Sequence, residues 1–117
     1  MKTSQAKLLS LSLNTMMEEK GVVGLKLMRN KRMIDDELKE YYQLEADLFR
    51  KYGEEKDGQL VINKDSENYK KFMEEIEPLN NEEVTFNFRF IAEEELANSN
   101  LTANQMADIW EWMVEHD

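Results

Sequence analysis

The sequence has no cysteine, one histidine, one proline and four glycines among its 117 residues. The absence of cysteine excludes disulfides, thiolate metal sites and thiol nucleophiles. The single histidine, His116, stands next to the last residue, so neither a Ser-His-Asp arrangement nor a histidine-bearing zinc site is expected. The four scattered glycines form no Gly-rich phosphate loop. These absences exclude several common catalytic classes and leave the function open.

Long apolar runs are also absent, and no stretch approaches the ~20 apolar residues of a membrane span. Near the start, Ser10 and Ser12 interrupt a series of leucines, and no small-residue cleavage site follows before Glu18. We therefore expect neither a signal peptide nor a membrane partner, and a cytoplasmic location.

Positive charge is scarce outside the first third of the chain. The net charge is −10; residues 1–34 hold seven Lys and Arg against two Glu, whereas residues 35–117 hold eight against twenty-three acidic residues. The acidic part would repel nucleic acid and anionic lipid, which disfavours direct nucleic-acid binding. The excess of acidic residues is explained by a need for solubility. Alternatively, the acidic surface binds a basic partner or mimics nucleic acid.

What the sequence does contain is a strong helical pattern over residues 25–52. At 100° per residue, its apolar side chains fall within an arc of about 120°, and charged side chains fill the opposite arc. The stripe consists of Leu27, Ile34, Leu38, Tyr41, Tyr42, Leu48, Phe49 and Tyr52. The pattern predicts one helix about 40 Å long, whose stripe the rest of the chain must cover.

A first helix is predicted over residues 4–20, with Thr3 or Ser4 as its cap and Gly21 as its stop. The short link over residues 21–24 predicts an antiparallel helical hairpin with the long helix.

Two further helices are predicted later in the chain. Asp65 or Ser66 caps the earlier one, and Pro78 ends it near residue 77. Thr102 and Gln105 form a capping box for the last helix. Its predicted buried face is Met106, Ile109, Trp110 and Met113.

The clearest strand covers residues 84–90, where Val84, Phe86, Phe88 and Phe90 alternate with Thr85, Asn87 and Arg89. Its expected partner is a short strand at residues 59–62, after a turn at Asp57-Gly58. The predicted fold is therefore mostly helical α+β: a long helical hairpin, a small two- or three-stranded sheet and two further helices. One domain over residues 1–117 is expected.

Few side chains indicate a site. Glu45 lies in the middle of the apolar stripe, where a buried, unpaired carboxylate is costly, so either water reaches the stripe there or a cation such as Arg89 pairs with Glu45. A structural ion pair is expected rather than a catalytic role. Carboxylate pairs such as Asp36 and Glu40 lie on solvated faces, and we expect no catalytic, cofactor-binding or metal-binding residues and no cofactor.

Partner contacts are the remaining kind of site. The basic cluster of Lys26, Arg29, Lys31 and Arg32 lacks the interleaved aromatic residues of a nucleic-acid surface, and a solvated helix face explains it better. Candidate contact residues for a protein partner are Tyr42, Phe49, Trp112, Arg29 and Arg32.

The order of turns and helices resembles a family of small phage and prophage proteins of Firmicutes, whose function is unknown. The resemblance rests on Lys20-Gly21, the basic turn at residues 29–31, the acidic helix ending in Lys51-Tyr52-Gly53, the Asp57-Gly58 turn, and Leu101-Thr102 before a final helix. It implies a phage origin and a role in the host cytoplasm or in virion assembly.

Three functions follow as hypotheses. The first is a non-enzymatic interaction or assembly protein that binds another protein or a second copy of itself. The second is an acidic inhibitor that mimics nucleic acid and blocks a host nucleic-acid-binding enzyme. The third is a metal-dependent enzyme built from carboxylates, which the lack of a converging carboxylate set disfavours.

Overall fold

The structure, a computed structural model, describes residues 1–115, and His116 and Asp117 lie outside the described residues. Its fold is mostly helical α+β. The molecule measures 50 × 31 × 22 Å with a radius of gyration of 17.0 Å, which is more elongated than the roughly 13 Å expected for a compact domain of this length. The described elements are α1 (Thr3–Asn14), α2 (Gly21–Glu37), α3 (Lys39–Tyr52), β1 (Glu54–Lys56), β2 (Gln59–Val61), α4 (Glu67–Asn80), α5 (Glu93–Ala97) and α6 (Ala103–Met113).

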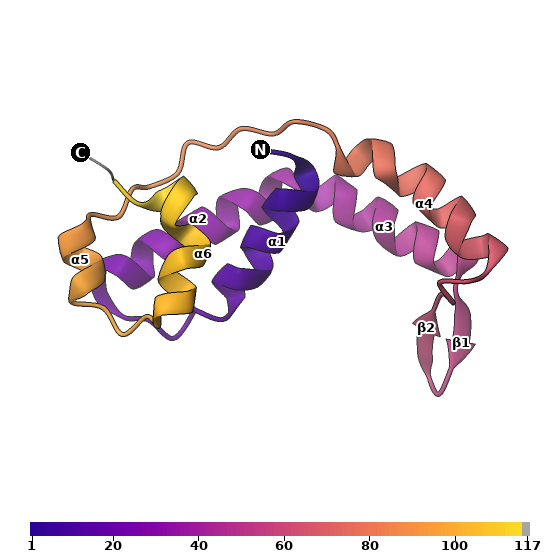
Figure 1. Cartoon of the computed structure of the whole chain (residues 1–117), viewed down its shortest axis with the longest axis horizontal. Helices are drawn as coiled ribbons and strands as arrows, with labels where there is room; N and C mark the ends of the chain where they lie inside the picture. The colour runs from indigo at the N-terminus through magenta and orange to yellow at the C-terminus, as the bar shows by residue number, and fades with distance from the viewer. Residues whose placement is uncertain (116–117) are drawn as a thin grey trace.

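The predicted long helix is present as α2 and α3, which follow one another along the long axis of the molecule (Figure 1). It begins at Gly21 and is interrupted only at Leu38, whose φ and ψ are −90° and 6°. The helical bonding pattern continues through this point, because Leu38 N–H donates to Ile34 O and Tyr42 N–H donates to Leu38 O, both at 2.9 Å. The long helix of residues 21–52, which we call the rod, therefore bends at Leu38 without separating into unrelated pieces.

The helical hairpin is also present, but its first helix is shorter than predicted. α1 ends at Asn14, and Gly21, with φ of 71°, begins α2 instead of ending α1. The cap prediction was wrong as well: Lys2 is the cap residue, and its N–H donates to Gln5 Oε1 at 2.7 Å. The link is therefore six residues long, from 15 to 20, and reaches the start of α6.

The predicted pairing of residues 84–90 with residues 59–62 was wrong. β2 instead pairs with β1 in an antiparallel hairpin at the end of the molecule opposite α5 (Figure 1). Asp57 and Gly58 both have positive φ, 54° and 81°, as a tight two-residue hairpin turn requires. A local turn of this kind closes a short hairpin at little entropic cost, whereas the predicted pair needed a long connection.

Two further helix predictions need correction. α4 continues through Pro78 to Asn80, because a proline in the exposed last turn removes only one bond to an exposed carbonyl. In α6, the predicted capping box is present, with Gln105 N–H donating to Thr102 Oγ1 at 3.2 Å. However, Trp110, which was placed on the predicted buried face, is 43% exposed, whereas Trp112 is half-buried.

The apolar side chains form two clusters. The larger joins α1, α2, α5 and α6 with Phe88 and Ile91, and the smaller joins α3 and α4 through Leu48, Phe72 and Ile76. Tyr41 contacts both clusters. Its hydroxyl also donates to Asn80 Oδ1 of α4 at 2.5 Å.

Replacement of Tyr41 by phenylalanine is expected to reduce the decrease in the free energy of unfolding at alkaline pH. Burial, and then the charge of Glu45 close by, raises the pKa of Tyr41 to about 12. A raised folded-state pKa favours folding below the unfolded value of about 10, and this contribution is lost as the pH rises through about 12. Urea unfolding at about pH 8 and about pH 11 should show a smaller decrease for Tyr41→Phe than for the wild type. Equal decreases in the two proteins would contradict this.

Candidate functional site

Residues 84–90 cross the molecule as an extended chain between α4 and α5 (Figure 1). At one end, Val84 exchanges two bonds with Met1: its N–H donates to Met1 O at 2.8 Å, and its carbonyl accepts from the Met1 amino group at 3.1 Å. Just beyond the other end, Ile91 N–H donates to Met113 O at 2.8 Å. These bonds fix both ends of the segment.

Between the ends, one helix side chain holds the segment. Asn30 of α2 is completely buried, and its Nδ2 donates to Arg89 O at 3.0 Å. Arg89 N–H donates in turn to Asn30 Oδ1 at 2.8 Å. The side-chain amide of Asn30 therefore bonds both backbone groups of Arg89, as a residue of a neighbouring strand would, on the side of the segment that faces α2.

Most of the remaining backbone groups in the segment have no hydrogen-bond partner in the described part of the chain. Within residues 1–115, no hydrogen bond reaches the N–H or C=O groups of Thr85, Phe86, Asn87, Phe88 and Phe90. Backbone polar groups in folded proteins are nearly always paired with protein or water. An extended stretch with unpaired groups is an open strand edge, to which another extended chain can add.

The side chains of the segment alternate in burial, as in a strand lying on a helical layer. Thr85, Asn87 and Arg89 are exposed, whereas Phe86 is half-buried and Phe88 is buried. The Phe86 and Phe88 rings are stacked with their centroids 5.1 Å apart. Phe90 breaks the pattern, because 55% of it is exposed.

A small apolar cavity lies beside this edge. Its volume is about 180 Å³, which suits one apolar side chain. It is lined by Met1, Val84, Thr85, Phe86, Phe88, Phe90 and Trp112. Edge-binding domains combine main-chain hydrogen bonds with pockets for alternate side chains of the added strand. Residues 84–90 offer backbone groups for such bonds and a cavity beside them.

Carboxylates without ion pairs flank the segment. Glu82 precedes it, and Glu93, Glu94 and Glu115 line a surface hollow of about 260 Å³ after it. None of these four has an ion-pair partner within the described part of the chain. Glu83 differs, because it pairs with the Met1 amino group at 3.3 Å. Both ends of the edge are therefore negative.

The structure brings one of the five predicted contact residues to this edge, Trp112. Tyr42 is half-buried with its hydroxyl 3.5 Å from Asp35 Oδ1, and burial raises its pKa. Phe49 is half-buried against Phe72, with ring centroids 4.9 Å apart. Arg29 and Arg32 are exposed on α2.

The predicted pairing of Glu45 with Arg89 was wrong. Lys7 Nζ of α1 lies 2.6 Å from Glu45 Oε2, whereas Asn30 holds Arg89 against α2. The role predicted for Glu45, a structural ion pair, is nevertheless confirmed.

Two lysines of the basic cluster are engaged inside the molecule. Lys26 Nζ lies 2.7 Å from Glu95 Oε1, and this hydrogen bond lowers the pKa of Glu95. Lys31 Nζ lies 2.6 Å from Asp35 Oδ2. Burial alone would raise the pKa of Asp35, but hydrogen bonds from Lys31 and Ser10 outweigh burial and lower it.

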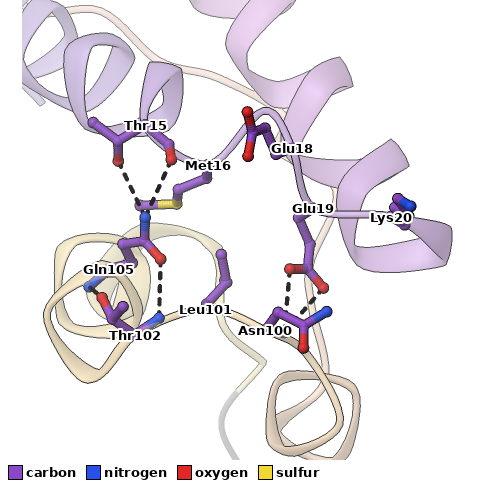
Figure 2. A pocket seen from close by; sticks show the side chains of 9 residues that line it. All are labelled: Thr15, Met16, Glu18, Glu19, Lys20, Asn100, Leu101, Thr102 and Gln105. Atoms are coloured by element: carbon purple, nitrogen blue, oxygen red, sulfur yellow. Dashed lines mark hydrogen bonds between the residues drawn. The ribbon is translucent and has the colours of Figure 1, made fainter.

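A larger hollow of about 430 Å³ separates the link after α1 from the start of α6 (Figure 2). Its polar groups bond to one another: Gln105 Nε2 donates to Thr15 O at 3.2 Å, and Asn100 N–H lies 3.2 Å from both carboxylate oxygens of Glu19. These bonds span the hollow and join its two walls. We interpret it as a structural junction.

Metal sites and membrane spans are two other features to consider in residues 1–115. No group of three or more His, Cys, Asp or Glu side chains there is arranged to hold a metal ion. Over the same residues, no helix combines the length and apolar character that crossing a membrane requires.

The chain was also compared with known proteins. No family model matches it, and no curated protein and no solved structure is found to be similar to it.

Proposed function

We propose that the protein is a non-enzymatic protein–protein interaction or assembly protein, and that its contact surface is the open edge of residues 84–90. The observation that carries this proposal is the set of backbone groups on Thr85, Phe86, Asn87, Phe88 and Phe90 that have no hydrogen-bond partner within residues 1–115, next to an aromatic cavity. Unpaired edges of this kind template the addition of another chain, and natural proteins usually cover or blunt them.

An exposed aromatic side chain at the edge supports the same function. Phe90 is 55% exposed, and large aromatic side chains are enriched at protein interfaces. We further propose a phage or prophage origin in a Firmicute, which rests on the resemblance in the pattern of turns and helices. On that origin, the partner is a host or virion protein.

Site-specific photo-crosslinking in a Firmicute host tests the proposal. Photoreactive benzoylphenylalanine is placed at Phe90 in the full chain, and at Leu60 of β2 in a matched control. Leu60 is 46% exposed and lies on the distant hairpin, so general stickiness should affect both positions alike. We expect ultraviolet light to give a discrete protein adduct from position 90 that position 60 does not give. The same adducts from both positions, or none from position 90, would contradict the proposal.

A further inference from the structure

Resting on this proposed function, we propose that the edge of residues 84–90 takes up an extended, positively charged segment of the partner as an added β-strand. The segment has Lys or Arg near both ends and seats an apolar side chain in the cavity beside Met1 and Trp112. Three features carry this inference: the direction of the free backbone groups, the place of the cavity, and the charge at the two ends.

The chain's own first residues show which side of the segment accepts a strand. Residues 1–3 lie antiparallel to the stretch before Thr85: Thr3 N–H donates to Glu82 O at 2.8 Å, and Val84 exchanges two bonds with Met1. In an extended chain, the backbone groups of alternate residues point to the same edge. The next groups on this edge therefore belong to Phe86 and Phe88, and they have no partner within residues 1–115.

The opposite side is closed at Arg89, where the amide of Asn30 takes both backbone groups. An added strand can therefore bind only on the side that residues 1–3 occupy, where it would continue beyond Met1 along Phe86 and Phe88. The cavity lies along this path, because Met1, Phe86 and Phe88 all contribute to its lining. A strand that adds here places its alternate side chains toward the aromatic rings.

The charges select the kind of strand. Glu82 stands at one end of the edge, and Glu93, Glu94 and Glu115 stand at the other, all exposed and without ion pairs in the described chain. A partner with basic ends would pair with these carboxylates, and electrostatic complementarity would speed its association and exclude acidic competitors.

A second copy of this protein fits the edge poorly. In antiparallel pairing centred on Asn87, Glu82 of one chain lies opposite Ala92 of the other and next to its Glu93. Parallel pairing sets identical carboxylates side by side. Either arrangement brings like charges together between two chains of net charge −10 each. The same carboxylates repel nucleic acid.

Peptide selection on the full-length protein tests the inference. A display library of random short peptides is panned against the wild type, and enriched peptides are synthesised for calorimetry. We expect enriched peptides to carry Lys or Arg toward both ends and alternating apolar residues between them. Exchanging their basic ends for glutamate should weaken binding at least about tenfold, and raising the salt to about 0.5 M should weaken the basic peptides. Methylating the peptide's backbone nitrogens should abolish binding.

Two charge-matched variants separate the edge from the overall charge. Glu93→Gln with Glu94→Gln should weaken the basic peptides several-fold. Glu54→Gln with Glu55→Gln on β1 makes the same change in net charge, and it should leave binding unaltered. Enrichment of acidic or neutral peptides, no enrichment, or equal effects of the two variants would overturn the inference.

Solution mass by light scattering tests whether a second copy of the protein occupies the edge. We expect a monomer in the absence of peptide; a dimer that Phe90→Glu dissociates would assign the edge to a second copy and overturn the inference. If position 90 crosslinks a protein but basic peptides do not bind, the proposed function stands and this inference fails. If position 90 gives no adduct as well, both fail.

Discussion

Replacement of Phe88 by alanine is expected to lower the free energy of unfolding by about 3–4 kcal/mol. Phe88 is 7% exposed, packs in the larger cluster and stacks on Phe86 with centroids 5.1 Å apart. Because the backbone of Phe88 has no hydrogen-bond partner within residues 1–115, side-chain packing alone holds this part of the segment on the helices. Urea unfolding followed by circular dichroism would measure the change.

Phe90 provides the matched control, since it is the same residue type two positions along and is 55% exposed. Phe90→Ala should change the free energy of unfolding by no more than about 0.5 kcal/mol. It should nevertheless weaken partner binding. Equal losses of stability for the two variants would show that the segment does not lie on the helices by its Phe86–Phe88 face.

The second large effect is expected at Asn30. The Asn30 side chain is completely buried and makes two hydrogen bonds to the backbone of Arg89. Asn30→Ala removes both bonds and leaves the N–H and C=O of Arg89 without their partner. A buried polar group left unsatisfied costs about 1–3 kcal/mol, so we expect a loss of about 2–4 kcal/mol for the pair. Thermal and urea unfolding of the variant would measure it.

Asn30→Asp separates hydrogen bonding from packing, because it keeps the shape of the side chain. Its carboxylate can still accept from Arg89 N–H, but it faces Arg89 O with no proton to donate and places a charge in the core. This variant should be at least as unstable as Asn30→Ala near neutral pH. Asn87→Ala, at an exposed asparagine in the same segment, should be within about 0.5 kcal/mol of the wild type. A mild Asn30→Asp would mean that Arg89 is bonded to water instead.

The helical part of the fold was predictable because its signals are local. The stripe of residues 25–52 predicted the rod, and Thr102 with Gln105 predicted the start of α6. The break at Leu38 carries no glycine or proline to indicate it. The shape of the molecule was not predictable either, since it depends on where each stretch packs.

The strand prediction failed for a different reason. Alternation from Val84 to Phe90 correctly indicates an extended chain with one face on a core, but it contains no information about a pairing partner. The Asp57-Gly58 turn brings β1 beside β2 as a local partner. Residues 84–90 are instead bonded by Met1 and Asn30.

The candidate site was therefore visible only in part. Trp112 could be named from the sequence, and the acidic run at Glu93–Glu95 was evident. The cavity was not, because Met1 and Trp112 reach it from opposite ends of the chain. Phe90 looked like a core residue by its position in the alternating pattern, and only packing shows that it is exposed.

Hydrogen exchange of single amides in the free protein tests most directly whether residues 84–90 form an unpaired strand edge. The amides of Val84, Arg89 and Ile91 have carbonyl or amide oxygen partners, whereas those of Phe86 and Phe88 have none within residues 1–115. We expect Phe86 and Phe88 to exchange at least about 100-fold faster than those three neighbours. Protection of Phe86 and Phe88 equal to that of Val84 would contradict an open edge.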